Sequence, residues 1–503
     1  MTRTLIVWGT TSGAGKSWLA TALCRVAARR GLNVAPFKAQ NMSNNARVVA
    51  CGPDADQALG EIGSAQYFQA GAAGVQPHTD MNPVLLKPEG ETASQVVLHG
   101  QPRSDLKGMP WRQRSAVLAV EARHGFDRLA SRHQLIVVEG AGSPAEINLA
   151  PQDYVNLGTA RWAKEAGPTA ALLVSDIDRG GSFAHCYGTW ALLPDDLRPL
   201  LQGFVLNRFR GDAALLAPGP QQLQALTGVS LAGVLPLMRH HGLPEEDGLL
   251  HPDEQGLIAA TDGPASALRL RVAVIAPPHI SNLDEFLPLS QVPGLRLSWV
   301  RSPAQAEGAD WLVLPGSKQA SGDLAWLRAQ GWDQRLRAHA AAGRPVLGVC
   351  GGLQILGESL DDPHGHDGQA VEHLPGLGLL PLHTCFGPLK RLRKAAVRFG
   401  APSGAWATLA GVQVPAYEIR CGQTNGSHDR SDCAVLFDSQ GQAIGWQRGS
   451  VLGVYAHGLF EQAAVLQALF GATVPTLEQA YDTLADAVEA HFDPVLLRRL
   501  LED

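Results

Sequence analysis

The chain has 503 residues, a formal net charge of −6, 45% hydrophobic residues and 17% charged residues. This length exceeds what one hydrophobic core usually spans, so we expect two or more domains. The acidic balance provides no electrostatic footprint for nucleic acid, and no apolar run approaches the roughly 20 residues of a membrane span. Seven cysteines without a C-x-x-C pair, and a start that enters a strand at once, predict reduced thiols in a cytoplasmic protein.

The first predicted element is a phosphate-binding loop. Residues 4–17 read TLIVWGTTSGAGKS, an apolar strand followed by a glycine-rich loop and the start of a helix. Backbone N–H groups of such a loop cradle phosphates, while a lysine neutralises the β and γ phosphates and a serine hydroxyl ligates Mg²⁺. We therefore expect an ATP site that uses Thr10, Ser12, Gly13, Gly15, Lys16 and Ser17. Threonine at position 10, where the strict motif has glycine, gives a variant that resembles the dethiobiotin synthetase group, whose members transfer phosphate to carboxylates or carbamates.

Three polar segments follow, KAQNMSNNA (38–46), EIGSAQ (61–66) and DMNPVLLKP (80–88). Amide and lysine side chains gather there at the ends of short apolar runs. This pattern predicts a surface that grips a ligand rich in amides and carboxylates. The candidate substrate-binding residues are Lys38, Gln40, Asn41, Asn44, Asn82 and Lys87.

Apolar strands then recur at 135–142, 171–178, 201–209 and 231–236, separated by helical segments. Continuous apolar strands of this kind predict a parallel sheet that is covered on both faces. Glu139 closes the first of them, and we expect it to bind Mg²⁺ together with Ser17, a plain loop carboxylate being the alternative. Asn207 resembles the asparagine that reads the adenine edge in the dethiobiotin synthetase group. Asp176, Asp178 and Arg179 either face the transferred phosphate or form a solvated turn.

A composition change marks the predicted boundary between the two halves. Residues 251–267, HPDEQGLIAATDGPASA, interrupt the alternation of strands and helices, so we expect a first domain over 1–250 and a second over 268–470. Strands of the second domain are predicted at 271–278, 295–300, 311–316 and 345–350. Apolar residues at helical spacing in the tail, 471–503, predict one or two closing helices. The fold class is therefore α/β in both domains.

The segment PVLGVCGGLQIL (345–356) places Cys350 between a buried strand and a glycine-rich helix start. A side chain on such a strained turn projects into open space, where backbone N–H groups and the helix dipole stabilise a thiolate and then an oxyanion. The pattern Gly348-x-Cys350-x-Gly352-x-Gln354 resembles the nucleophile motif of class I glutamine amidotransferases. A buried structural cysteine is the alternative for Cys350 taken alone.

That resemblance implies further residues of a glutamine site. Gly316, at the end of a strand in WLVLPGSK, and Gly351 would form the oxyanion hole, and Gln354 would bind glutamine. His457, after the strand SVLGVY, would be the general base for Cys350. The usual His-x-Glu would need an acid at 459, where the chain has Leu459, and Glu461 has the wrong spacing. This departure matches the subgroup that acts in cobalamin synthesis and leaves the group that orients His457 undetermined.

The polar segments 38–46 and 80–88, together with both motif sets, resemble the cobyric acid synthase family over nearly the whole chain. The resemblance implies a P-loop synthetase domain followed by a class I glutamine amidotransferase-like domain. It also implies amidation of the b, d, e and g carboxylates of adenosylcobyrinic acid a,c-diamide, with ATP, Mg²⁺ and glutamine, through acyl phosphates and a shielded ammonia path. Two alternatives are a cobyrinic acid a,c-diamide synthase and a P-loop partitioning or scaffold ATPase with an inert second domain.

Two histidine-rich groups, at 239–241 and at His364, His366, Asp367 and His373, lack the helical or hairpin spacing of a zinc site. Solvated loops explain them better.

Overall fold

The computed structural model describes residues 1–52, 58–89, 94–238, 241–243, 268–368, 370–426 and 433–502. Contacts divide the chain into two compact units, residues 1–249 with 476–503 and residues 250–475. The predicted linker, 251–267, and Arg239 and His240 lie outside the described residues. Within the described part, no helix is both long and apolar enough to cross a membrane.

The first unit is built on a six-stranded sheet in the order β12-β11-β10-β1-β9-β2, and every neighbouring pair in it is parallel. The strands are β1 (Arg3–Gly9), β2 (Val34–Phe37), β9 (Leu135–Glu139), β10 (Thr169–Asp176), β11 (Leu201–Phe209) and β12 (Leu231–Pro236). The predicted apolar runs all become strands of this sheet. Because the strands are parallel, their carboxyl ends meet at one edge, which collects the loops that carry the predicted ATP site.

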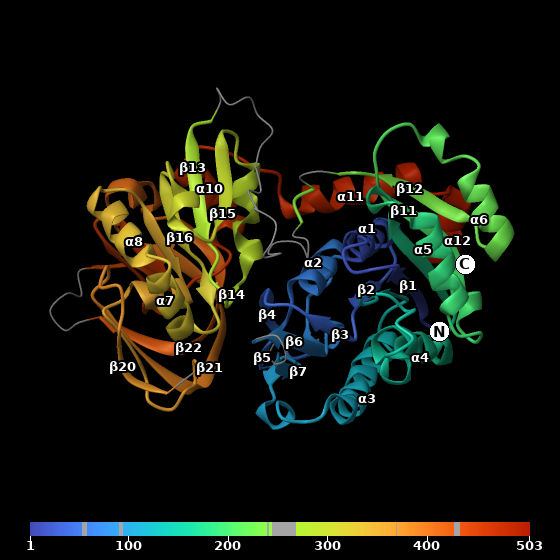
Figure 1. The fold of residues 1–503 in the computed structure, drawn as a ribbon, viewed down its shortest axis with the longest axis horizontal. Coiled ribbons are helices and arrows are strands. Elements are labelled where there is room, and N and C mark those ends of the chain that lie inside the picture. Colours follow the sequence, from blue (N-terminus) through green and yellow to red (C-terminus); the bar gives the residue numbers. More distant parts are fainter. Residues whose placement is uncertain are drawn as a thin grey trace. The chain divides into compact units, whose positions relative to one another are not determined.

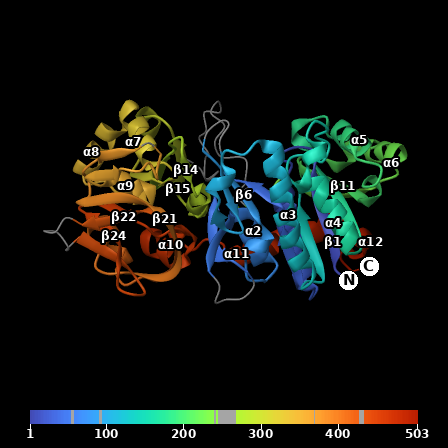
Figure 2. The same ribbon diagram turned by 90° about the horizontal axis from the view of Figure 1, so that it is seen from below.

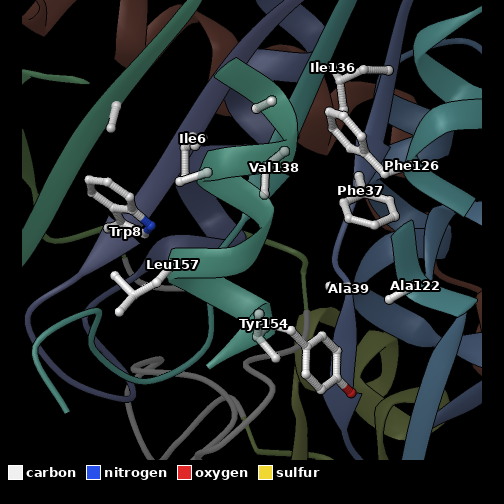
Figure 3. Close-up of a cluster of buried hydrophobic side chains, with 14 of the residues drawn as sticks. Ile6, Trp8, Phe37, Ala39, Ala122, Phe126, Ile136, Val138, Tyr154 and Leu157 are labelled. Carbon is white, nitrogen blue, oxygen red and sulfur yellow. The ribbon is translucent and has the colours of Figure 1, made fainter. Parts of the chain in front are cut away.

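Alternate side chains of each strand enter different cores, as expected of a sheet covered on both faces. Ile6, Trp8 and Val138 face one core, which is shown in Figure 3, and Leu5 and Val7 face the other. The first core is covered by α3 (Trp111–Ala130), α4 (Thr159–Ala166), α5 (Ser182–Leu192) and α6 (Gly219–Thr227), of which α3 and α4 lie side by side in Figure 2. The second is covered by α1 (Lys16–Arg29), α2 (Ser64–Ala72) and two helices of the C-terminal tail.

Those tail helices are α11 (Leu477–His491) and α12 (Pro494–Leu501), and α11 packs along α1 (Figure 1). Leu484 and Val488 are fully buried in the second core. Arg25 and Arg29 of α1 form ion pairs with Asp482, at 2.7 and 2.9 Å. A capping box of Thr476 and Gln479 begins α11. The chain therefore returns after the second unit to cover the helix that begins at the phosphate-binding loop.

The polar segments form a small module beside the main sheet. Its strands are β3 (Gln40–Met42), β4 (Ala46–Ala50), β5 (Leu59–Gly63), β6 (Val84–Pro88), β7 (Ser94–Leu98) and β8 (Gln101–Pro102). They pair as a four-stranded sheet, β3-β6-β7-β8, and a separate β4-β5 hairpin. The sequence pattern did not predict these short strands.

The second unit holds an 11-stranded mixed sheet. Its parallel part, in the order β15-β13-β16-β18-β25, consists of β13 (Leu270–Ile275), β15 (Leu295–Val300), β16 (Trp311–Leu314), β18 (Val346–Val349) and β25 (Val451–Val454). The antiparallel continuation is built on the long hairpin β21 (Leu382–Phe399) and β22 (Gln413–Gly426), with β23 (Ala434–Asp438) and β24 (Ala443–Arg448) joining it to β25. Strands β19 (Ser359–Asp362) and β20 (Val371–Pro375) complete the edge.

Helices α7 (Ala320–Ala329), α8 (Trp332–Ala341), α9 (Gly351–Leu356) and α10 (Ala463–Phe470) pack on this sheet, and a short antiparallel pair joins β14 (Ile280–Ser281) to β17 (Gly316–Ser317). The predicted strands at 271–278, 295–300, 311–316 and 345–350 are confirmed as β13, β15, β16 and β18, of which β13, β16 and β18 end before the predicted residue. Parallel strands again place their carboxyl ends together, here at Cys350 and His457.

Candidate active sites

The phosphate-binding loop lies at the carboxyl end of β1, between β9 and β10. Gly13 and Gly15 have φ of 69° and 100°, left-handed values that favour glycine. A Cβ on Gly15 would lie 1.9 Å from Nδ2 of Asn207, so a side chain at this position would displace the Asn207 amide from the loop. Lys16 Nζ donates to the carbonyls of Thr11 (3.0 Å) and Gly142 (3.2 Å). The loop is thus shaped around the buried lysine that begins α1.

Other residues of the predicted ATP site surround this loop. The backbone N–H of Thr10 donates to the Val174 carbonyl at 2.9 Å, and Ser12 is exposed. Asn207, at the end of β11, donates from Nδ2 to the Ala14 carbonyl at 3.0 Å. The structure therefore brings Asn207 to the loop, 193 residues away in the chain, with one donor engaged by the loop backbone.

Glu139 lies at the end of β9 and is completely buried. Its Oε1 accepts hydrogen bonds from Ser17 Oγ (2.8 Å) and Lys38 Nζ (2.9 Å), and its Oε2 accepts from the amides of Gln66 and Gln69. Burial opposes ionisation, but the Lys38 ammonium and the hydrogen bonds from Lys38, Ser17 and Gln69 hold the pKa of Glu139 below its ordinary value. A buried, ionised carboxylate therefore faces the start of α1.

The candidate substrate-binding residues divide by what they contact. Lys38 reaches Glu139 directly, and Asn41 reaches it through Gln66 Oε1 at 3.2 Å. Gln40 accepts a hydrogen bond from the Tyr154 hydroxyl at 2.5 Å. Lys87 forms an ion pair with buried Glu61. The Oδ1 atom of Asn44 is buried and has no hydrogen-bond partner in the described part of the chain.

Asn82 is almost completely buried, and its amide is used by the backbone. Its Oδ1 accepts from the Gly63 N–H at 2.9 Å, and its Nδ2 donates to the carbonyls of Lys38 (3.1 Å) and Val84 (2.9 Å). This geometry fits a residue that positions Lys38 better than one that contacts a ligand.

Cys350 lies between β18 and α9 with φ 50° and ψ −106°, an unusual backbone for a residue with a side chain. Its thiol donates to the Ile419 carbonyl of β22 at 3.3 Å. The glycines around it are required by space: a Cβ on Gly352 would lie 2.1 Å from the Leu314 carbonyl oxygen, and one on Gly348 would lie 2.5 Å from Leu356. The chain therefore forms the strained strand-to-helix turn that the motif predicted.

His457 is buried beside Cys350, and its partner is Glu285. The imidazole Nδ1 lies 2.9 Å from Glu285 Oε1, and the Gly458 N–H donates to Glu285 Oε2 at 3.0 Å. The Tyr417 ring stacks on the imidazole with centroids 5.3 Å apart. Burial lowers the pKa of His457, but the charge of Glu285 and hydrogen bonds with Cys350 and Glu285 raise it to about 10. The imidazole is therefore a positively charged imidazolium at neutral pH, and its Nδ1–H donates to the Glu285 carboxylate.

The predicted oxyanion residues lie against this pair. A Cβ on Gly316 would meet Ser281 Oγ at 2.8 Å and His457 Cε1 at 3.4 Å, and one on Gly351 would lie 2.7 Å from the Ser317 backbone nitrogen. Gly316 and Gly351 therefore lie as close to Ser281 and Ser317, respectively, as glycine permits. Gln354 is buried, and its Nε2 donates to the Tyr455 hydroxyl at 3.3 Å. The arrangement suits stabilisation of an oxyanion that forms on a carbonyl attacked by Cys350.

The histidine-rich loop of the second unit makes ordinary contacts. His373 Nδ1 lies 3.0 Å from Asp361, and Asp367 accepts from the N–H groups of Ala320 and Ser321 at the start of α7. Within the described residues, no group of three or more His, Cys, Asp or Glu side chains is placed to hold a metal ion.

Comparison with known proteins assigns both units. Residues 5–247 match the CobQ/CobB/MinD/ParA nucleotide binding domain, and residues 271–465 match the CobB/CobQ-like glutamine amidotransferase domain. The cobyric acid synthase of Methylibium petroleiphilum is 59% identical over all of this chain and 97% of its own length. Those of Leptothrix cholodnii (58%) and Variovorax paradoxus (57%) each align with 99% of the chain and with 97% and 99% of their own lengths. The chain belongs to the cobyric acid synthase family.

Among solved structures, PurLQS from Thermotoga maritima aligns with 43% of this family member and 98% of its own length, at 14% identity and a TM-score of 0.32. We base no argument on a likeness this weak. The assignment to the cobyric acid synthase family rests on the two domain matches and on the full-length relatives.

Sequence reasoning missed three polar residues of these sites in this cobyric acid synthase family member. Glu285 lies in a short 3-10 helix, η9 (Leu283–Gln291), 172 residues before His457. Gln66 and Gln69 lie on α2, on the side that faces Glu139. Gln66 ends the predicted polar segment 61–66, but nothing in the local sequence indicated that it and Gln69 would meet Glu139 or that Glu285 would meet His457.

Proposed function

We propose that the chain amidates the b, d, e and g carboxylates of adenosylcobyrinic acid a,c-diamide with glutamine and ATP, giving adenosylcobyric acid. The observation that carries the proposal is the presence in one chain of two different sites. One combines a phosphate-binding loop with buried Glu139 and Lys38, and the other combines Cys350, His457 and Glu285. Phosphoryl transfer and ammonia release are the two steps that amide formation from a carboxylate requires.

The first unit would activate the carboxylate. A carboxylate does not condense with ammonia, because it is anionic and its oxide is a poor leaving group. Transfer of the γ-phosphoryl group of ATP gives an acyl phosphate and ADP, and phosphate then leaves when ammonia attacks. Lys16 and Lys38 supply positive charge beside the loop, which is the electrostatic contribution that phosphoryl transfer requires. The candidate substrate residues Gln40, Asn41, Asn44 and Lys87 lie in the small module beside the main sheet, and Asn41 is linked to Glu139 through Gln66.

Ser17 and Glu139 fit a Mg²⁺ ion bound with ATP. Ser17 Oγ and Glu139 Oε1 lie 2.8 Å apart, and a hydroxyl and a carboxylate are oxygen ligands of the kind that Mg²⁺ prefers. These two side chains would hold the ion, and the ion would neutralise phosphate charge. Gln66 and Gln69 would keep the other carboxylate oxygen fixed.

The second unit would release ammonia from glutamine. The Cys350 thiol passes its proton to His457, and the resulting thiolate attacks the side-chain amide carbon. The oxyanion that forms lies near the backbones of Gly316 and Gly351. His457 protonates the departing ammonia and then takes a proton from the water that hydrolyses the γ-glutamyl thioester to glutamate. Glu285 keeps Nδ1 protonated, so that Nε2 is the nitrogen that exchanges protons.

Ammonia must reach the acyl phosphate unprotonated, since ammonium is not a nucleophile. We therefore expect a path shielded from solvent. An enzyme that removes free ammonia, added to the glutamine-dependent reaction, should leave the yield unchanged. Abolished product formation would contradict a shielded path without affecting the remainder of the proposal.

Mass spectrometry of adenosylcobyrinic acid a,c-diamide incubated with the protein, Mg-ATP and glutamine tests the function. We expect four successive mass changes, each corresponding to replacement of a carboxylate OH by NH₂. The variant Cys350→Ala should lose the reaction with glutamine and keep it with ammonia. Absence of any product from wild-type protein that binds ATP would refute the proposal, and cobyrinic acid would then be tested as the substrate.

A further inference from the structure

Arg179 lies over the phosphate-binding loop from the side opposite Glu139. Its Nη2 would be 3.3 Å from a Cβ built on Gly13, so the guanidinium is close to the middle of the loop. Arg179 follows β10, whereas Glu139 ends β9, and β1 lies between these two strands. The two residues therefore flank the loop.

The backbone turn between β10 and α5 fixes the position of Arg179. Buried Asp176, the last residue of β10, accepts from the Asp178 N–H at 3.0 Å, and its carbonyl accepts from Ser182 Oγ at 2.9 Å. Gly180 and Gly181 have φ of 76° and 68°, which turns the chain sharply into α5. The tight turn fixes where the Arg179 side chain begins.

Arg179 shares its carboxylate partner, Asp176, with a second arginine. The Asp176 carboxylate lies 3.4 Å from Arg179 Nε and 3.1 Å from Arg208 Nη1, so one carboxylate is shared by two guanidinium groups. The Arg179 side chain keeps 60% of its surface exposed, while that of Asp176 is 3% exposed. Arg179 can therefore present its outer nitrogens to an anion without breaking a buried ion pair.

Lys16 and Arg179 occupy different positions at the loop. Lys16 is buried and donates to the carbonyls of Thr11 in the loop and Gly142 after β9, whereas Arg179 lies exposed at the rim. Of the three phosphates of ATP, the γ-phosphate must face an acceptor that arrives from outside the loop. A planar guanidinium donates two parallel hydrogen bonds to phosphate oxygens, and charge at that point lowers the barrier to phosphoryl transfer.

We propose that Arg179 contacts the γ-phosphate of ATP and stabilises it during transfer. This inference deepens the proposed function and rests on it: the bond between the γ-phosphorus and the β,γ-bridging oxygen breaks, a bond to a substrate carboxylate oxygen forms, and ADP leaves with the electron pair. Arg179 remains protonated throughout and gains hydrogen bonds to the equatorial oxygens.

Equilibrium binding of ADP and of a non-hydrolysable ATP analogue tests the inference, together with amidation supplied with ammonia. In Arg179→Ala we expect the analogue to bind about 10- to 100-fold more weakly, ADP to bind within about twofold of wild type, and amidation to slow by at least as much as analogue binding weakens. Arg179→Lys should recover part of the loss. Arg210→Ala, which removes an exposed arginine paired with Asp178 at the same sheet edge, should change none of these quantities.

Equal weakening of ADP and analogue binding in Arg179→Ala, or unchanged amidation, would overturn the inference. Glutaminase activity of the variant reports that the second unit is folded, and circular dichroism reports on the whole chain. If wild-type protein amidates the corrinoid and Arg179→Ala does so equally well, only this inference fails. If wild-type protein makes no amide but Arg179→Ala still loses the analogue selectively, the proposed function fails and the phosphate contact stands.

Discussion

The substitution Glu285→Gln tests the geometry of the glutamine site most directly. Glu285 offers two acceptor oxygens, one to His457 Nδ1 at 2.9 Å and one to the Gly458 N–H at 3.0 Å. Glutamine has nearly the same shape but only one acceptor oxygen, so its NH₂ group must oppose one of these two donors. The variant therefore loses both the negative charge and one hydrogen bond in a buried place.

The magnitude follows from the pKa of His457. Despite burial, Glu285 and Cys350 raise this pKa to about 10 from an ordinary value of 6.5. A difference of roughly 3.5 units corresponds to about 5 kcal/mol in favour of the protonated imidazole. The charge of Glu285 is the largest of the contributions that raise this pKa, and general acid–base catalysis typically contributes about 10²–10⁴-fold to a rate. We therefore expect kcat/KM for glutamine hydrolysis to fall about 10²-fold in Glu285→Gln, toward 10³-fold if the tautomer is also lost.

Release of glutamate from glutamine measures this effect, and amidation supplied with ammonia measures whether the first unit is intact. Glu285→Gln should lose the first activity and keep the second. Glu358→Gln is the matched control, because Glu358 pairs with His383 at 3.3 Å in the same unit but is half-exposed. Glutaminase activity within about twofold of wild type would refute the role given to Glu285. Loss of both activities would show instead that Glu285 is needed for folding.

Three further predictions concern stability and the ATP site. The raised pKa of His457 stabilises the second unit fully below pH 6.5, the ordinary value, and this contribution is lost as the pH rises toward about 10. The free energy of unfolding of this unit, measured in urea between pH 6.5 and 10, should therefore decrease with pH. Glu285→Gln should make this pH dependence weaker. Gly15→Ala should weaken ATP binding, because its Cβ meets the Asn207 amide and its φ of 100° favours glycine. Gly31→Ala, also at positive φ (77°) but with open space around it, should bind ATP normally. Equal ATP affinity of the two variants in binding calorimetry would contradict the crowding at Gly15. Leu484→Ala should lower the free energy of unfolding of the first unit by about 2–5 kcal/mol, because it removes a fully buried side chain. Asp482→Ala, which removes a half-exposed ion-pair partner, should lower it by about 1 kcal/mol or less. Equal losses in urea titrations would contradict core packing as the main contribution of α11.

Local motifs were readable from the sequence because each is contained in a short stretch of chain. The phosphate-binding loop needs only a strand, glycines, Lys16 and Ser17, and the turn at Cys350 needs only the glycines around it. The apolar runs also identified the strands of both parallel sheets except β2 (Val34–Phe37), which was not predicted. A strand buried on both faces has no polar alternation, so the pattern alone predicts its surroundings.

The long hairpin of the second unit escaped prediction for the opposite reason. Strand β21 contains the run KRLRK, and most side chains between Gly387 and Lys394 are exposed or half-buried, so no apolar run marks it. Its pairing with β22 depends on backbone hydrogen bonds along 13 residue pairs, which any sequence of suitable register can make.

What only the tertiary structure decided is which distant side chains meet. Glu285 reaches His457 across 172 residues, Lys38 reaches Glu139 across 101, and Asp482 of the tail reaches Arg25 across 457. Sequence spacing carries no information about such pairs, because they are set by the order of strands in each sheet and by where each carboxyl end falls. The sequence by itself therefore determined the two chemistries and the strands that carry them, and the packing of those strands determined the partners that tune each group.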